Sequence, residues 1–130
     1  MNYEARKINS FVDLNAWQEG HKLVLEIYEI TKKFPSAENF GLTSQMQRSA
    51  VSITSNIAEG FGRQTYKDKT HFYFISAGSL TELHNQVIIS KDLKYITIEK
   101  FGVIGGQIIK VQKILNGLIK SSKSRIIHNS

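Results

Sequence analysis

The sequence predicts an all-α protein that folds as an up-down antiparallel four-helix bundle. Apolar residues recur three or four positions apart through most of the chain, which is the period of helices that bury one face. No stretch alternates apolar and polar residues as a half-buried strand would. The connections between the helical stretches are short, and short connections make neighbouring helices antiparallel. The 130 residues suit a single domain, for which about 100–200 residues is usual.

The first helix is predicted at residues 13–34, after a short N-terminal arm of residues 1–12 that shows no periodicity. Two adjacent rows of apolar side chains, which include Trp17 and Leu23, give this helix a wide apolar stripe. We expect Trp17 to belong to the core. Pro35 is the only proline, and it ends the helix because the residue before a proline avoids helical backbone angles.

The second helix is predicted at residues 43–61. Ser44 is followed three residues later by a glutamine, as a capping box requires, and Thr43 is an equally good cap. Gly60 and Gly62 end the helix.

The third helix is predicted at residues 66–93, with Thr65 as its cap, and the fourth at residues 97–120. A heptad of apolar residues runs through the fourth helix: Phe101, Ile104, Ile108, Val111, Leu115 and Leu118. The apolar pattern fades after these positions, so residues 121–130 are expected to form a frayed basic tail.

Several classes of site are excluded. The chain has no cysteine, so it can hold neither disulfides nor thiolate metal sites. Its four histidines lie far apart without metal-ligand spacing, and there is no phosphate loop, nucleophile elbow or paired-carboxylate motif. We therefore expect no catalytic residue, no metal and no cofactor. The same lack of catalytic motifs predicts that the protein is not an enzyme. No signal peptide or membrane span is present, which predicts a soluble, cytoplasmic protein.

The positive charge is concentrated at one end of the sequence. The net charge is +6, and no acidic residue follows Glu99. Five basic residues beyond that point are the candidate nucleic-acid-binding residues: Lys110, Lys113, Lys120, Lys123 and Arg125. Lysines with few aromatic neighbours suit contacts to RNA or DNA phosphates better than base reading. The alternative is that they solvate an outer face and favour a helix C-terminus.

A row of polar residues follows one face of the second helix, beside its apolar row. With a glutamate of the third helix, it forms a candidate structural polar seam: Gln45, Arg48, Ser52, Asn56, Glu59, Arg63 and Glu82. One interpretation is an ordinary solvated face. The other is a seam between helices or between subunits, in which Arg48 meets a carboxylate such as Glu82.

Glycines interrupt the third and fourth helices. Gly78 in the third, and Gly102 with Gly106 in the fourth, would let another backbone approach closely. They indicate tight helix packing or a subunit contact, unless the helices simply tolerate them.

Several motifs resemble those of the 23S rRNA intervening-sequence protein family. They include Phe40-Gly41-Leu42, Arg48-Ser49-Ala50 and above all the run from Ser55 to Arg63. The resemblance extends over about residues 11–119. Thr54 stands where a proline is common in that family.

The resemblance implies a bacterial four-helix bundle without an established enzymatic role. The family is also similar to the accessory protein of diversity-generating retroelements, a basic pentameric barrel that binds nucleic acid and a reverse transcriptase. By this analogy the chain forms a homo-oligomer, a pentamer, with its positive surface open to RNA or DNA. The alternative function is a protein-interaction scaffold that docks an acidic protein partner without binding nucleic acid.

Overall fold

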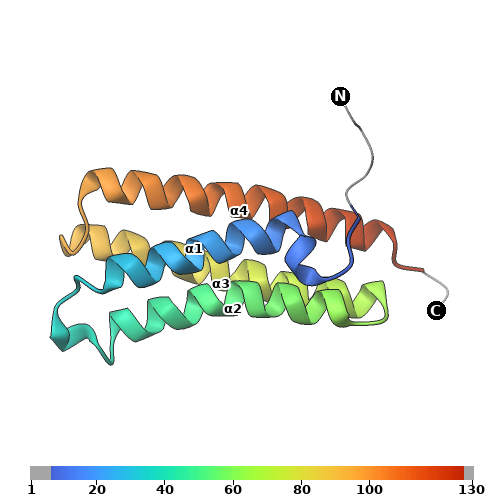
Figure 1. The fold of residues 1–130 in the computed structure, drawn as a ribbon, viewed down its shortest axis with the longest axis horizontal. Coiled ribbons are helices and arrows are strands. Elements are labelled where there is room, and N and C mark those ends of the chain that lie inside the picture. Colours follow the sequence, from blue (N-terminus) through green and yellow to red (C-terminus); the bar gives the residue numbers. More distant parts are fainter. Residues whose placement is uncertain (1–6, 128–130) are drawn as a thin grey trace.

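Four helices run up and down side by side, as predicted (Figure 1). The computed structural model describes residues 7–127, so part of the expected arm and of the expected tail, including His128, lies outside the described residues. The helices are α1 (Asn15–Thr31), α2 (Leu42–Gly62), α3 (Tyr66–Asp92) and α4 (Ile98–Ser124), with short 3-10 turns η1 (Phe11–Asp13) and η2 (Ser36–Glu38). Residues 7–127 contain no strand. The predicted fold class is confirmed.

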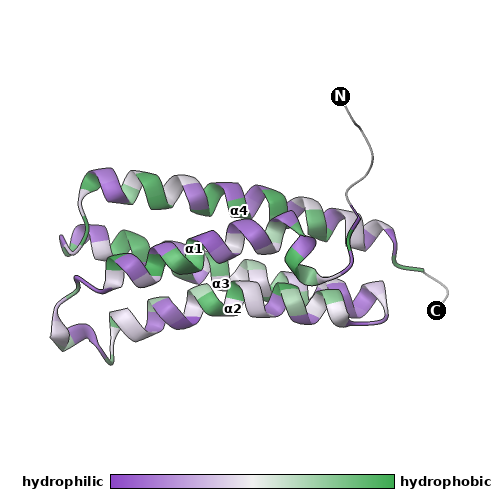
Figure 2. Ribbon diagram, viewed as in Figure 1, coloured by the Kyte–Doolittle hydropathy of each residue, from purple (hydrophilic) through white to green (hydrophobic). Residues whose placement is uncertain are grey.

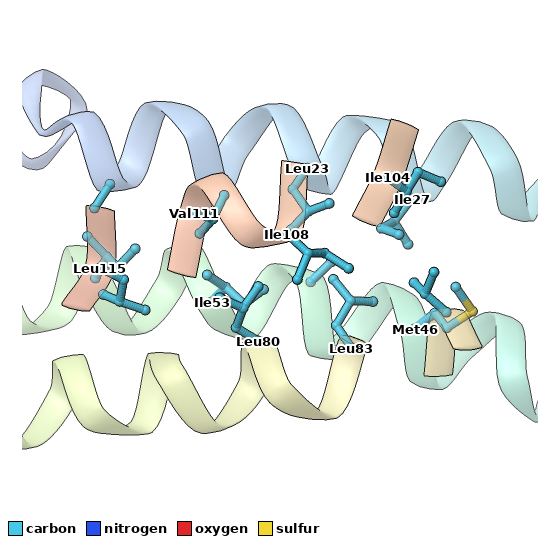
Figure 3. Close-up of a cluster of buried hydrophobic side chains, with 14 of the residues drawn as sticks. Leu23, Ile27, Met46, Ile53, Leu80, Leu83, Ile104, Ile108, Val111 and Leu115 are labelled. Atoms are coloured by element: carbon cyan, nitrogen blue, oxygen red, sulfur yellow. The ribbon is translucent and has the colours of Figure 1, made fainter. Parts of the chain in front are cut away.

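The core lies along the axis of the bundle and receives side chains from all four helices (Figure 3). Leu23, Ile53, Leu83 and Ile108 are among the side chains with essentially no exposed surface. Each contributes about 1.5–3 kcal/mol by leaving water. Green and purple alternate along every helix in Figure 2, as expected of helices with one buried face. Within residues 7–127, none of the helices is long and apolar enough to cross a membrane.

The fourth helix ends at Ser124, four residues beyond the predicted end, so the first part of the expected tail is helical. After Leu115 the buried positions are Ile119 and Ser122, whereas Leu118 of the predicted heptad is only partly buried. The Ser122 hydroxyl shares a 2.7 Å hydrogen bond with that of Thr70 in α3. A small polar residue therefore extends the packed face where the apolar pattern had indicated fraying.

The second helix begins without the predicted side-chain caps. Gly41 is its N-cap residue and makes no side-chain hydrogen bond. Instead the Glu38 carboxylate, from η2, accepts the backbone N–H of Leu42 at 3.1 Å. Ser44 donates to the Gly41 carbonyl at 3.4 Å, which uses its hydroxyl as a donor and not as the acceptor that a capping box needs. A residue before the helix thus accepts the first backbone N–H of α2, and the caps predicted at Thr43 and Ser44 are not formed.

Close helix contacts occur at other glycines than the expected ones. A Cβ atom on Gly60 would lie 2.7 Å from Tyr73 Cε1, and one on Gly20 would lie 3.1 Å from Thr54 Cγ2. These two glycines bring α2 against α3 and α1 against α2. In contrast, a Cβ atom on Gly78, Gly102 or Gly106 would meet nothing within 4 Å. Tight packing within the chain is therefore not the reason for these three glycines.

The aromatic start of the first helix lies at the margin of the core. Trp17 is only partly buried, contrary to prediction, and packs against the core from outside. Its indole stacks on the His21 imidazole with ring centroids 4.8 Å apart, and Phe11 of η1 meets it edge-on. His21 is exposed. The turn η1 thus folds back to cover the indole, which is why part of the expected arm is ordered.

Candidate nucleic-acid interface

The five basic residues expected to bind nucleic acid lie in or directly after α4, and all of them are exposed. Lys113 and Lys120 are seven residues apart, which places them two turns and about 10 Å from each other on the outer face of the helix. Within residues 7–127 neither lysine forms an ion pair. Both ammonium groups are therefore available to an anion from outside.

Lys110 differs from these two lysines because it already has a carboxylate partner. Its ammonium lies 3.2 Å from Glu19 of α1, and Lys22 lies 2.9 Å from the same side chain. Gln107 donates a further hydrogen bond to Glu19 at 3.2 Å. The hydrogen bonds from Lys22, Gln107 and Lys110, in that order, lower the pKa of Glu19 to about 2. The α1 side of α4 is consequently less positive than the sequence predicts.

Lys123 and Arg125 lie on the side of α4 that faces α3. The Lys123 ammonium lies 5.8 Å from the centre of the Phe74 ring. The Arg125 guanidinium lies 5.7 Å from the Tyr66 ring and donates a 3.2 Å hydrogen bond to the Tyr66 hydroxyl. Aromatic side chains of α3 thus hold both cations at this end of the bundle.

Three further cations lie near this end, and none of them was among the predicted nucleic-acid-binding residues. Arg63, Lys67 and Lys69 belong to the connection between α2 and α3 and to the first turn of α3. The end of α4 lies beside this connection (Figure 1), and the hydrogen bond between Ser122 and Thr70 links the two. We call the six cations gathered here the basic end: Arg63, Lys67, Lys69, Lys120, Lys123 and Arg125. These cations could have been predicted from the antiparallel pairing of α3 and α4, because it places the start of α3 beside the end of α4.

Two of these added cations already have partners. The Arg63 guanidinium pairs with Glu59 at 3.0 Å and lies 4.5 Å from the centre of the Phe72 ring. The Lys69 ammonium donates a 2.6 Å hydrogen bond to the Phe61 carbonyl oxygen, which satisfies a carbonyl at the end of α2. Such contacts fix the positions of the charged groups, which stay accessible to an incoming anion.

The structure divides the candidate polar seam. Its inner part joins α2 to α3, because the Ser52 hydroxyl hydrogen-bonds that of Ser79 at 2.8 Å and Asn56 donates to Ser52 at 3.1 Å. Glu82 accepts a 2.9 Å hydrogen bond from Ser49. It forms no ion pair with Arg48 within residues 7–127, so the expected pair is absent from the single chain.

The outer part of the seam lies on the surface of the bundle. Gln45 and Arg48 are exposed. Glu59 and Arg63 pair with each other one turn apart, and an exposed pair of this kind contributes little, about 0–1 kcal/mol. Whether Gln45 and Arg48 contact another subunit stays a prediction.

Comparison with known proteins gives one family and one fold. The family model described as 23S rRNA-intervening sequence protein matches residues 12–117 of the chain. Among solved structures, the chain is similar to a protein with unknown function from the S23 ribosomal protein family of Bacteroides thetaiotaomicron. The TM-score is 0.75 and the identity 23%, over 81% of this chain and 98% of that chain. At this level of identity, the similarity shows that the two proteins share a fold. No curated protein matches.

Proposed function

Because the chain belongs to the 23S rRNA-intervening sequence protein family, we propose that it binds nucleic acid, RNA in preference to DNA, through phosphate contacts to a basic surface. It does so as a cytoplasmic, non-enzymatic homo-oligomer. The observation that carries the proposal is the set of exposed cations on α4 that have no carboxylate partner in the described chain, foremost Lys113 and Lys120.

The arrangement of these cations favours the sugar-phosphate backbone over bases. Lys113 and Lys120 are spaced along the outer face of α4, and Lys123 and Arg125 add two cations at the end of the helix, on the side that faces α3. Flexible lysines contact phosphates without reading sequence, and each contact releases counterions, so that affinity falls as salt rises. Lys110 contributes less than its neighbours because Glu19 already neutralises part of its charge.

Assembly into an oligomer would multiply these weak contacts through avidity. Support comes from α3, which carries apolar residues on its outer side as well as in the core. Phe74, Ile75 and Ile89 are 51%, 40% and 39% exposed, and large apolar side chains that gather on a surface often mark a contact with another protein. Gly78 lies exposed on the same helix and leaves room for a second backbone. A ring of five subunits is the assembly we propose.

The same apolar side chains support the second candidate function, a scaffold that docks an acidic protein partner. In that case the cations would serve protein contacts only. Salt-dependent binding of arbitrary RNA separates the two functions, because the first function requires it and the second does not.

The test is a titration of the protein with a fluorescent rRNA fragment and a matched DNA duplex at two salt concentrations. We expect micromolar or tighter binding that weakens steeply with salt and favours RNA. The variant K113Q/K120Q/K123Q should lower the slope of log affinity against log salt by about 2–3, since each lost phosphate contact removes about 0.7–0.9.

The matched control is K32Q/K33Q/K100Q, which removes the same charge at the opposite end of the bundle, where all three lysines are exposed. It should retain most of the affinity. Equal losses in both triple variants would overturn the site, and no binding at low salt would favour the scaffold. Sedimentation velocity measures the subunit number separately, and a monomer at all concentrations would contradict the proposed ring.

A further inference from the structure

A pocket of about 380 Å³ opens at the basic end, between η1, the start of α3 and the end of α4. Pockets for small ligands usually measure about 300–1,000 Å³, so this one suits a molecule the size of a single nucleotide and not a folded polymer. One wall is apolar and includes the ring of Phe61 together with Ile8, Leu14 and Leu118. Such a wall accepts a flat, weakly polar group such as a nucleobase.

The polar side of the pocket is positive. Lys69 and Arg125 line it, and no carboxylate does among the described residues. The Lys69 ammonium gives one N–H to the Phe61 carbonyl and the Arg125 guanidinium gives one to the Tyr66 hydroxyl, so both groups keep further donors for a ligand. A smaller pocket at the other end of the bundle, of about 160 Å³, sets Glu29 beside Lys33 and Lys100. Unlike that pocket, the one at the basic end combines two cations with an apolar wall, and no acid is among the described residues that line it.

A buried hydroxyl without a partner also lines this pocket. Tyr73 is only 3% exposed, and its ring packs against Gly60. Its hydroxyl has no hydrogen-bond partner within residues 7–127. The hydroxyl oxygen nevertheless keeps some accessible surface. It is therefore open to the pocket. Burial foremost, and the neighbouring Tyr66 next, raise the pKa of Tyr73 to about 12, so at neutral pH the hydroxyl keeps its proton and can donate it to a hydrogen bond.

We propose that this pocket binds one nucleotide, with its phosphate group held by Lys69, Arg125 and the Tyr73 hydroxyl and its base against the apolar wall. The phosphate would supply the acceptor that the Tyr73 hydroxyl lacks. Charge-assisted hydrogen bonds of this type are stronger than neutral ones, which is why the phosphate and not the base carries most of the affinity.

The nucleotide can be free or can be the end of a strand. Tyr66 and Arg125 also border a neighbouring hollow that contains Lys67, so a strand whose terminal nucleotide occupies the pocket can continue past a further cation. This extends the proposed nucleic-acid binding to a second site, and it does not depend on the outer face of α4.

The experiment measures binding of uridine 5′-monophosphate by calorimetry and by amide shifts in NMR spectra. Uridine, inorganic phosphate, and a short oligonucleotide with and without a 5′-phosphate serve as comparison ligands. We expect the monophosphate to bind at least about tenfold more tightly than uridine. A preference for the phosphorylated oligonucleotide over the monophosphate assigns the pocket to strand ends, and the reverse order assigns it to free nucleotides.

The variants Y73F and R125Q should each weaken monophosphate binding by about threefold to tenfold or more, while K113Q, on the outer face of α4, should leave it within about twofold. Circular dichroism shows whether Y73F keeps its helices. Absence of monophosphate binding, equal affinity for uridine, or unchanged affinity in both pocket variants overturns the proposal. Long-RNA binding that depends on Lys113 and Lys120 tests the proposed function separately, so failure of one is distinguishable from failure of the other.

Discussion

The Tyr95 hydroxyl donates a 2.9 Å hydrogen bond to the Glu38 carboxylate, 57 residues earlier in the chain. The other oxygen of Glu38 accepts the first N–H of α2, and Tyr95 lies in the turn before α4. One carboxylate therefore caps a helix and ties together the two turns at the end of the bundle opposite the termini. The hydrogen bond to Glu38, with a smaller effect of burial, raises the pKa of Tyr95 above its usual value.

The variant Tyr95→Phe is expected to lower the urea midpoint of unfolding without changing the slope, because it removes this bond and little apolar surface. Tyr28→Phe is the matched control, since Tyr28 is 41% exposed and its hydroxyl has no hydrogen-bond partner within residues 7–127. A raised pKa means that the folded state holds its proton more tightly, so the contribution is full below pH 10 and is lost as the pH rises further. The wild-type protein should thus lose more stability above pH 10 than Tyr95→Phe does, and parallel alkaline curves would contradict this.

Two glycines of the bundle should respond in opposite ways to alanine. In Gly60→Ala the new methyl group would stand 2.7 Å from Tyr73 Cε1, which forces α2 and α3 apart and costs about 1–3 kcal/mol. In Gly117→Ala the methyl group would meet nothing within 4 Å. Because alanine favours the helix over glycine, the free energy of unfolding should rise by about 1 kcal/mol. Urea unfolding measures both. A stable Gly60→Ala variant would show that the helices can shift at no cost.

The network around Glu19 predicts a loss of stability in acid. Its pKa is lowered to about 2 by Lys22, Gln107 and Lys110, so its contribution is full above about pH 4.5 and disappears as the pH falls through 2. Glu19→Gln should be less stable than the wild-type protein at pH 7, and the difference should shrink between pH 5 and pH 2. Unfolding curves recorded at several pH values give this difference directly. A difference that does not change with pH would mean that packing, and not charge, accounts for it.

The hydrogen bond between Ser122 and Thr70 ties the last turn of α4 to α3, and we expect that turn to depend on it. Ser122→Ala should cost about 1 kcal/mol and increase amide exchange over the last turn. Ser124→Ala is the control, because Ser124 is exposed and its hydroxyl bonds only to the carbonyl of Ser121 in the same turn. Equal exchange in the two variants would show that the turn forms without the contact to α3.

The apolar periodicity was sufficient to predict the four helices and their up-down order, since burial of one face is what holds each helix in place. Features that arise from contacts between distant segments could not be predicted in this way. The cap of α2 comes from Glu38, which lies before the helix and is positioned by Tyr95. Ser122, in the last turn of α4, hydrogen-bonds to Thr70, which lies more than fifty residues away in the sequence.

In the candidate interface, too, some features could be predicted from the sequence, whereas others depend on contacts between distant segments. The charge asymmetry marked Lys113 and Lys120 as cations on an outer face, and the structure leaves them exposed. The ion pair of Lys110 with Glu19 depends on the packing of α1 against α4, which the pattern does not specify residue by residue. Tyr73 illustrates the remainder: the sequence pattern did not single it out, and the structure places it in the lining of a pocket.

The order in which the helices pack has a consequence for how the chain folds. α1 contacts α2, α2 contacts α3 and α3 contacts α4, and each of these pairs can form as a hairpin of neighbours in sequence. The contact between α1 and α4 joins the two ends of the chain, and its bond from Gln107 to the Glu19 carbonyl spans 88 residues. Closing a loop of that length costs more entropy than forming a hairpin. We therefore expect α1 and α4 to pair last. Local separation of α1 from α4 should be the first step when the bundle unfolds.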